Sequence, residues 1–202
     1  MSVQNVILVR HGHTLLNADG RLRGELDVAL DETGLREAEV LARVLMPLPI
    51  VAVISSPLAR ARETATPLSV ATGAPLRVDE RLRDRAYGEW AGALLADVQA
   101  KFGSIEAAPG VEPWEEVKSR ARAAFETATD QTPGGIDSVV ALVAHDAVLR
   151  ALIATVFPSI SPARLQFRTG SWTRLERSTS SERWHVVSLD DRPEELDPAG
   201  SS

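Results

Sequence analysis

The sequence predicts an α/β protein built on a mostly parallel sheet. Four consecutive apolar residues at positions 6–9 are typical of a strand that is buried on both faces. Apolar runs at positions 51–54 and 139–144 indicate strands of the same kind, and helical patterns separate all three. The first and last runs lead into polar residues that include His11 and His145. Because open parallel sheets bind ligands beyond the carboxyl ends of their strands, we expect the functional site there.

The remaining elements alternate along the chain. Asp31 is expected as the N-cap of a helix that ends at Pro47, and residues 15–30 before it are expected to form a loop without regular structure. Ser56 is expected to cap the next helix, with Pro57 in its first position and Gly73 at its end. The other predicted strands lie at 76–78, 172–176 and 184–189, with a turn at 178–182, and the other predicted helices lie at 94–102, 113–132 and 147–157.

Length and composition are those of an ordinary globular protein. Of the 202 residues, 44% are hydrophobic and 25% are charged, which predicts one domain over 1–191 and a disordered tail over 192–202. The net charge of −6 argues against a nucleic-acid partner. No cysteine is present, which excludes disulfides, thiolate metal sites and a cysteine nucleophile. No apolar run approaches the roughly 18 residues of a membrane span, so we expect a cytoplasmic protein without a membrane partner.

The residues that follow the strands favour phosphate chemistry. A parallel sheet can bring His11 and His145 together at one edge, and Arg10 and Arg60 can reach the same edge. Two guanidinium groups suit a phosphate because each can donate in parallel to two of its oxygens. A neutral imidazole among cations is a competent nucleophile toward phosphorus, since the neighbouring charges disfavour its protonation. A carboxylic acid is still needed to protonate the leaving oxygen.

Five short motifs follow one another along nearly the whole chain. They are Arg10-His11-Gly12-His13-Thr14 with Asn17, Gly24-Glu25-Leu26-Asp27-Val28-Ala29-Leu30, Ser56-Pro57-Leu58-Ala59-Arg60-Ala61-Arg62-Glu63-Thr64-Ala65, Leu82-Arg83-Asp84 followed by Gly88-Glu89-Trp90-Ala91-Gly92, and Val143-Ala144-His145. In this order they resemble the motifs of the histidine phosphatase superfamily, which includes the cofactor-dependent phosphoglycerate mutases and many phosphatases. The resemblance implies the phosphoglycerate mutase-like fold, a three-layer α/β/α arrangement with a mostly parallel central sheet.

The resemblance also implies an activity. A small phosphorylated substrate would phosphorylate His11, while Arg10, Arg60 and His145 bind the phosphoryl group, and neither a cofactor nor a metal would be needed. The residues expected to contact the substrate are Gly12, Thr14, Asn17, Arg23, Gly24, Tyr87 and Asp146. The function that follows is that of a phosphomonoesterase, an enzyme that hydrolyses a small phosphorylated metabolite through a phosphohistidine intermediate. The oligomeric state stays open between a monomer and a homodimer.

Two carboxylates compete for the role of proton donor. Asp84 holds the family position, although the family usually has Glu there, which reaches about 1.5 Å further. Asp146 follows His145 where the family usually has Gly, and this His-Asp pair resembles the distant acid-phosphatase branch, in which that Asp is the donor. Asp146 has an equally good structural role at the start of a helix. Asp84 is the favoured donor.

Three other functions fit parts of the pattern. The first is a phosphoglycerate mutase. Two segments argue against it: Trp114-Glu115-Glu116 stands where the mutases carry Trp-Arg-Arg for the substrate carboxylate, so its charge is opposite. In addition, Pro109-Gly110-Val111-Glu112 resembles the Pro-Gly-Gly-Glu of the phosphatases. His11 and His13 could form a metal pair of a metal-dependent hydrolase, but that fold needs about 250 residues and further ligands. A non-catalytic phosphate-binding relative is the third, and the presence of both histidines and both arginines argues against it.

Overall fold

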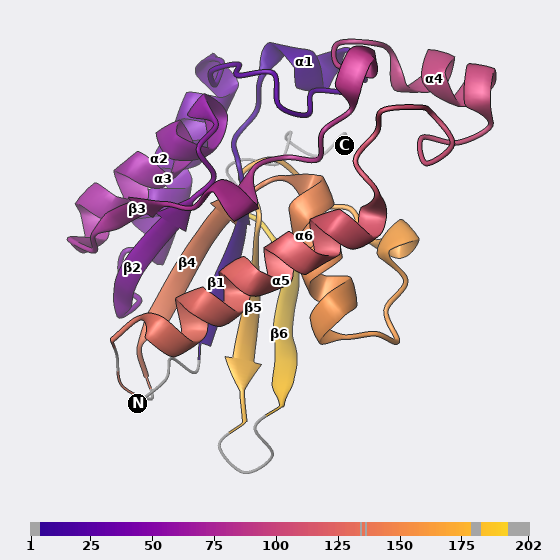
Figure 1. The fold of residues 1–202 in the computed structure, drawn as a ribbon. Helices are drawn as coiled ribbons and strands as arrows, with labels where there is room; N and C mark the ends of the chain where they lie inside the picture. Colours follow the sequence, from indigo (N-terminus) through magenta and orange to yellow (C-terminus); the bar gives the residue numbers. More distant parts are fainter. Residues whose placement is uncertain (1–4, 134, 136, 179–182, 194–202) are drawn as a thin grey trace, which may run out of the picture.

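The protein is organised around one six-stranded sheet with the strand order β3-β2-β4-β1-β5-β6 (Figure 1). The computed structural model describes residues 5–133, 135, 137–178 and 183–193. Strands β1 to β4 pair in parallel, whereas β5 pairs antiparallel with both β1 and β6, so the sheet is mostly parallel as predicted. The strands are β1 (Asn5–Arg10), β2 (Ile50–Ser55), β3 (Leu76–Val78), β4 (Val139–Ala144), β5 (Trp172–Arg177) and β6 (Trp184–Asp191), and each confirms a predicted strand.

Helices cover both faces of the sheet, which confirms the three-layer arrangement. Alternate residues of β1 enter different cores, because successive side chains of a strand point to opposite faces. Val6 and Leu8 pack with α5 and α6, whereas Ile7 and Val9 pack with α2 and α3. A strand with a core on each side must be apolar throughout, which explains the continuous run at 6–9. The covering helices are α2 (Glu32–Leu45), α3 (Ala59–Thr72), α5 (Trp114–Gln131) and α6 (Asp146–Val156).

Two short helices, α1 (Leu15–Ala18) and α4 (Leu95–Phe102), lie beyond the carboxyl ends of the parallel strands, at the top of Figure 1. The connections also contain the 3-10 helices η1 (Glu80–Leu82), η2 (Gly88–Trp90) and η3 (Pro162–Arg164). The expectation that 15–30 lacks regular structure is wrong at α1. There the side-chain oxygen of Asn17 accepts hydrogen bonds from both the backbone nitrogen and the hydroxyl of Thr14, which closes a turn that hydrophobic periodicity does not reveal.

The ends of the covering helices follow the predictions at two of three positions. Asp31 caps α2, because its carboxylate accepts a 2.9 Å hydrogen bond from the Gly34 nitrogen. Gly73 ends α3 with a φ of 70°, a conformation that glycine adopts without strain. Ser56 does not cap α3 and Pro57 is not its first residue: the N-cap is Leu58, the helix begins at Ala59, and the Ser56 hydroxyl bonds His145.

The predicted helices at 94–102, 113–132 and 147–157 are confirmed to within one or two residues as α4, α5 and α6. Most of the predicted turn at 178–182 and of the predicted tail at 192–202 lies outside the described residues. Within the described ranges, no helix combines the length and the apolar composition that crossing a membrane requires.

Candidate active site

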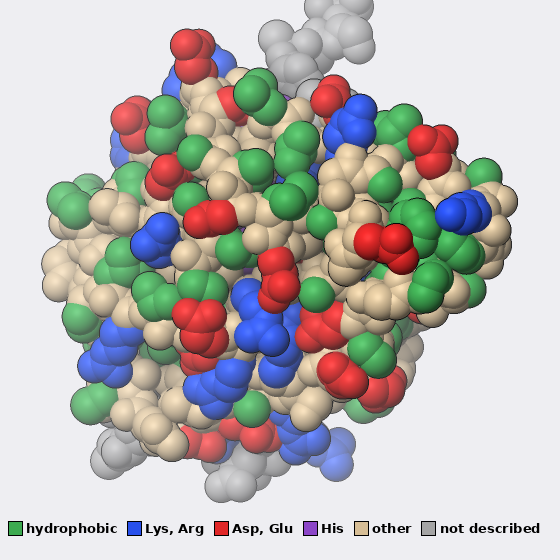
Figure 2. All heavy atoms as spheres, turned by 45° about the horizontal axis from the view of Figure 1, so that its top comes forward, with side chains coloured by type: hydrophobic (Ala, Val, Ile, Leu, Met, Phe, Trp, Pro, Cys, Tyr) green, Lys and Arg blue, Asp and Glu red, His purple; other side chains and the backbone are tan. Residues whose placement is uncertain are grey.

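The site is assembled where three neighbouring strands end. Backbone hydrogen bonds continue past the strands, because the nitrogen of His11 donates to the Ala144 carbonyl at 3.0 Å and that of Ser56 donates to the Val143 carbonyl at 2.9 Å. These bonds hold His11, Ser56 and, through β4, His145 at one edge of the sheet. Figure 2 shows this end of the molecule, where basic side chains gather in the centre with acidic ones beside them.

The imidazole of His11 is fully buried and held in one orientation. Its Nδ1 lies 2.7 Å from the Gly12 carbonyl oxygen, which can only accept a hydrogen bond, so Nδ1 carries the proton. Burial, the neighbouring His145 and the cations Arg60 and Arg10 hold the pKa of His11 well below its ordinary value. The ring is therefore neutral at neutral pH, and its Nε2, which has no hydrogen-bond partner among the residues that the structure describes, carries a lone pair.

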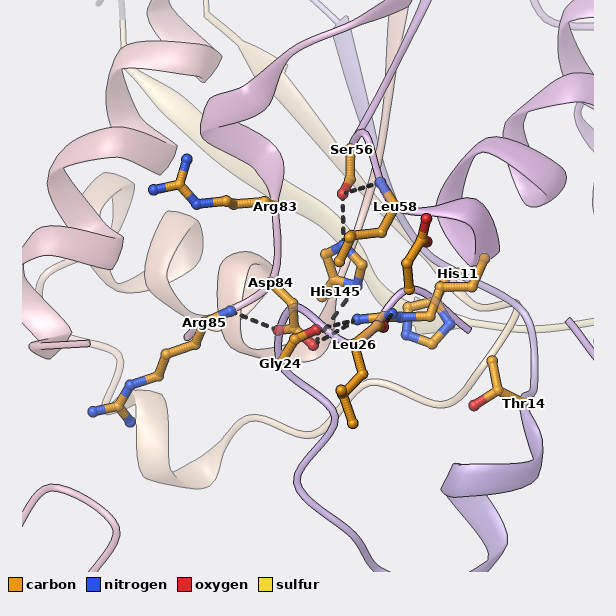
Figure 3. A network of polar contacts seen from close by, with 12 residues as sticks. His11, Thr14, Gly24, Leu26, Ser56, Leu58, Arg83, Asp84, Arg85 and His145 are labelled. Atoms are coloured by element: carbon orange, nitrogen blue, oxygen red, sulfur yellow. Dashed lines mark hydrogen bonds and ion pairs between the residues drawn. The ribbon is translucent and has the colours of Figure 1, made fainter. Parts of the chain in front are cut away.

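His145 lies beside His11, as the sequence predicts. The ring centroids are 5.1 Å apart, and both side chains are buried. Nε2 of His145 bonds the Ser56 hydroxyl at 2.8 Å, which fixes the ring, and Nδ1 faces the Asp84 carboxylate at 3.8 Å (Figure 3). Burial and the cations around it, Arg60 first, hold the pKa of His145 well below its ordinary value.

Arg60 connects the histidines to the segment that carries Asp84. Its side chain is fully buried and donates to the carbonyl oxygens of Leu26 at 2.7 Å and Gly24 at 2.8 Å. The same guanidinium lies 3.1 Å from Oδ2 of Asp84. Because α3 begins at Ala59, Arg60 lies in its first turn and points into the site. Arg60 bonds Asp84, whereas Arg62 is not among the residues that contact Asp84. The predicted choice of Arg60 agrees with this geometry.

The two candidate acids occupy different surroundings. Asp84 is almost completely buried, with Oδ2 between Arg60 and His145 and with Oδ1 accepting the Arg85 nitrogen at 2.9 Å. Asp146 opens α6, where its Oδ1 accepts the Phe167 nitrogen at 3.1 Å and its Oδ2 lies 3.5 Å from Arg150. Asp84 is thus the carboxylate next to the His145 imidazole, and Asp146 connects α6 to the segment before β5.

Arg10 and Arg23 are the basic residues of the site that have no carboxylate partner within the described part of the chain. Arg10 donates to the Phe167 carbonyl, and burial lowers its pKa, which nearby Asp146 partly offsets. Among the described residues, the Arg23 side chain forms no hydrogen bond or ion pair, and its Nε is buried. The charge of Arg23 nonetheless acts on His11 and His145, whose pKa values it helps to lower. Arg23 therefore lies close to both rings with its donors unused.

A cavity of about 800 Å³ opens onto this site. Of the predicted site residues, its walls include Arg10, Asn17, Arg23, Asp84, Tyr87 and Asp146. The others, His11, Gly12, Thr14, Gly24, Arg60 and His145, are not among its lining residues. Thr14 and Gly12 have structural contacts instead: Thr14 bonds Asn17, and the Gly12 nitrogen donates to the Thr64 hydroxyl at 2.9 Å. Because the Asn17 oxygen already accepts from Thr14, its amide nitrogen is the donor left for the cavity.

Sequence reasoning missed several residues of the cavity wall. Trp114 lies between two guanidinium groups, with Cζ of Arg85 5.6 Å and Cζ of Arg150 5.7 Å from its ring centroid. The spacing of Arg150, four residues after Asp146 on one helix, was the signal that could have found it. Ser56 was also missed as a partner of His145, because a serine before a proline resembles a helix cap.

Glu115 and Glu116 do not line the cavity, although the mutases carry substrate-binding arginines at the corresponding positions. Trp114 lines the cavity, but neither glutamate is among the lining residues, and the carboxylate of Glu115 bonds Lys118 at 3.0 Å on the surface. Successive residues of a helix are about 100° apart around its axis, so the two residues after Trp114 turn away from the cavity. The cavity wall is rich in arginine at this point. Among the described residues, no group of three or more His, Cys, Asp or Glu is arranged to hold a metal ion.

Known proteins resemble this chain over most of its length. The family model of the histidine phosphatase superfamily, branch 1, matches residues 6–192. The glucosyl-3-phosphoglycerate phosphatase of Mycobacterium tuberculosis is 33% identical over 192 residues, which cover 87% of this chain and 86% of that protein. The protein named probable phosphoglycerate mutase GpmB from Shigella dysenteriae is 30% identical over 201 residues, 92% of each chain.

The solved structures agree with the sequences. A mycobacterial glucosyl-3-phosphoglycerate phosphatase has a TM-score of 0.81 at 30% identity, covering 94% of this chain and 100% of the other. The same enzyme in complex with inorganic phosphate has a TM-score of 0.80 and covers 94% and 98% of the two chains. The family and the fold predicted from the five motifs are thereby confirmed. This chain belongs to branch 1 of the histidine phosphatase superfamily, and it is a phosphatase with the phosphoglycerate mutase-like fold.

Proposed function

We propose that this phosphatase hydrolyses a small phosphorylated metabolite through a phosphohistidine at His11. The observation that carries the proposal is the state of the His11 ring. The Gly12 carbonyl engages Nδ1, and Nε2, beside His145, is left with a lone pair and with no partner among the described residues. A neutral histidine whose free nitrogen lies among cations is the form that attacks phosphorus.

The reaction proceeds in two displacements. In the first, Nε2 of His11 bonds to phosphorus, the bond from phosphorus to the ester oxygen breaks, and that oxygen takes a proton from Asp84. In the second, water attacks the phosphohistidine, the nitrogen–phosphorus bond breaks, and Asp84 takes up a proton from the water. The products are the alcohol and inorganic phosphate, and His11 is again neutral. Asp84 is proposed over Asp146 because its carboxylate lies beside Arg60 and His145.

The charges of the pocket match a phosphate ester. Arg60 pairs with Asp84, Arg85 with Glu106, and Arg150 with Asp146. Within the described residues Arg10 and Arg23 have no ion-pair partners, and protonation of Asp84, which its role as acid requires, leaves the charge of Arg60 free for the phosphoryl group as well. We propose that Arg10, Arg23, Arg60 and His145 bind the phosphoryl group, with the Asn17 amide as a further donor.

The leaving group is proposed to be larger than a simple alcohol. The cavity beyond the phosphate pocket is lined by amides and guanidinium groups, which suit hydroxyl and carboxylate groups; among them are Gln99, Gln166, Arg85 and Arg150. The similar mycobacterial proteins are named glucosyl-3-phosphoglycerate phosphatases. That compound, which carries a sugar and a carboxylate, is therefore the first substrate to test. We further propose that turnover needs no metal, that neither nucleic acid nor membrane is a partner, and that the enzyme works in the cytoplasm.

The test is a set of steady-state assays in the presence of EDTA. The esters are glucosyl-3-phosphoglycerate, 3-phosphoglycerate, a sugar phosphate and 4-nitrophenyl phosphate, and release of inorganic phosphate is measured. A parallel assay with 2,3-bisphosphoglycerate measures interconversion of phosphoglycerates. The proposal expects hydrolysis in EDTA, with the highest kcat/KM for the sugar-bearing carboxylate ester. Interconversion faster than hydrolysis would establish the mutase instead, and activity that requires an added divalent ion would contradict the metal-free reaction.

A further inference from the structure

Arg120 and Glu112 form a nearly buried ion pair behind the segment that carries Asp84. Two parallel contacts join them: Nε of Arg120 lies 2.7 Å from one carboxylate oxygen of Glu112, and the other oxygen accepts from the second guanidinium nitrogen at 2.9 Å. Both side chains are about nine-tenths buried. Burial alone would raise the pKa of Glu112, but hydrogen bonds from Arg120 and from a backbone nitrogen lower it, so the pair is ionised.

The remaining donors of Arg120 all go to the backbone around Asp84. One nitrogen donates to the carbonyl oxygens of Arg81 at 2.8 Å and Arg83 at 2.6 Å, and the other donates to the carbonyl of Asp84 at 3.1 Å. A single rigid guanidinium therefore holds three carbonyls of the segment 81–84. A lysine could not do so, because its ammonium is a compact charge without the planar fork.

Glu112 holds the other side of the same segment. Its carboxylate accepts from the Ala86 nitrogen at 3.0 Å, and its own backbone nitrogen donates to the Ala86 carbonyl at 2.8 Å. Its carbonyl accepts Nε of Arg85 at 2.8 Å. Arg120 thus binds the backbone of residues 81, 83 and 84, and Glu112 binds the backbone of residue 86. Neither Arg120 nor Glu112 is among the residues that line the cavity.

We infer that Arg120, oriented by Glu112, is a positioning residue that sets where the Asp84 carboxylate stands relative to His145 and the substrate oxygen. The inference rests on the proposed role of Asp84 as proton donor. Asp84 has a short side chain, so its reach depends on where its backbone is held. A displacement of about 1 Å can cost about 10²-fold in rate when the displaced group takes part in the reaction. Loss of the contacts should thus weaken proton donation and leave substrate binding largely intact.

The test compares Arg120→Lys with Arg81→Lys on two phosphate esters. Arg81 is a matched control, because it also connects this segment to α5, donating to the Ala123 carbonyl and the Thr127 hydroxyl, but makes no contact with residues 83–86. Glycerol 3-phosphate has a leaving group that needs a proton, and 4-nitrophenyl phosphate has one that needs little help. We expect Arg120→Lys to lower kcat/KM about 10-fold to 10²-fold on the first ester and less than about threefold on the second. Arg81→Lys should change neither.

Two further variants make every outcome informative. Glu112→Gln keeps the shape of the buried pair and should show the same discrimination between esters more weakly, even if Arg120→Lys folds poorly. Asp84→Asn is the reference variant: if it lowers kcat/KM equally on both esters, Asp84 is not the proton donor. Suppose instead that Asp84→Asn lowers kcat/KM more on glycerol 3-phosphate than on 4-nitrophenyl phosphate, while Arg120→Lys and Glu112→Gln lower kcat/KM equally on both esters or not at all. In that case only the positioning role is overturned. In the double variant Asp84→Asn/Arg120→Lys we expect no loss on glycerol 3-phosphate beyond that of Asp84→Asn.

Discussion

At the scale of single residues, the site depends on two histidines that are buried without charge. In the unfolded chain both would titrate near a pKa of about 6.5. In the folded chain burial and nearby cations hold the pKa values of His11 and His145 well below that value. Below pH 6.5 or so the unfolded chain therefore binds more protons than the folded one, and folding loses stability as the pH falls.

This difference predicts a pH dependence of the free energy of unfolding. The free energy should be flat above about pH 7 and should fall below it by up to about 1.4 kcal/mol per pH unit for each histidine. Urea unfolding between about pH 7.5 and pH 5 measures the slope. Replacing His11 by Asn should reduce the slope, whereas replacing the exposed His185 should not. An identical slope in wild type and His11→Asn would show that His11 is not held neutral by the fold.

Arg23 is the second residue with a specific consequence. Its guanidinium has no partner among the described residues, so a bound phosphate would use donors that are otherwise idle. A hydrogen bond to a charged group contributes about 1.5–3 kcal/mol, which corresponds to about 10-fold to 10²-fold in affinity. Arg23→Gln should raise the inhibition constant of inorganic phosphate by that factor. Arg36→Gln, which removes an exposed charge from α2, is the control; equal inhibition constants in the two variants would exclude Arg23 from the phosphate site.

Residue by residue, the strand ends and the motifs were sufficient to place His11, His145 and Arg60 together. What they could not give is the identity of partners far apart in sequence. Ser56 looks like a helix cap locally, and its bond to His145 spans 89 positions. Likewise, the pairing of Asp84 with Arg60 depends on how two loops meet in space.

At the scale of elements, the first turn of α2 packs directly on the segment that follows β1. A methyl group added to Gly34 would lie 2.1 Å from the His13 carbonyl oxygen and 2.8 Å from its nitrogen, and both are backbone atoms that cannot easily move aside. His13 follows His11 by two residues, so this close approach helps to fix the path of the chain through the site. The fit between a helix and a loop is a property of packing, which hydrophobic periodicity alone does not predict.

Gly34→Ala should therefore reduce both stability and activity. Overpacking of this kind costs about 1–3 kcal/mol, and the displaced segment should lower kcat/KM although Gly34 does not line the cavity. Urea unfolding and steady-state assays on the same preparation measure the two effects. Gly135→Ala is the control, because its added methyl would meet, of the described residues, only a side-chain oxygen at 4.0 Å. A Gly34→Ala enzyme as stable and as active as the control would refute this packing constraint.

At the scale of the whole molecule, the mostly parallel sheet and both helix layers follow from apolar runs and helical spacing. Short elements beyond the strands do not, because α1 depends on side-chain hydrogen bonds and not on a hydrophobic face. The charge of the outer cavity does not follow from these patterns either, since it depends on which side of α5 faces inward. Glu115 turns outward, and Arg85 and Arg150 stand beside Trp114 instead. A protein with a net charge of −6 thus places five arginines in the wall of one cavity.

The measurement that tests the central claim most directly is capture of the phosphoenzyme. Wild type and His11→Asn are mixed with a substrate labelled in its phosphoryl group, in the presence of EDTA, and quenched within milliseconds to seconds. The wild type should carry a label that is stable in base and lost in acid, as expected of a phosphohistidine, and His11→Asn should carry none. A base-stable, acid-labile label that persists in His11→Asn, or hydrolysis by wild type with no label under any quench time, would contradict covalent catalysis at His11.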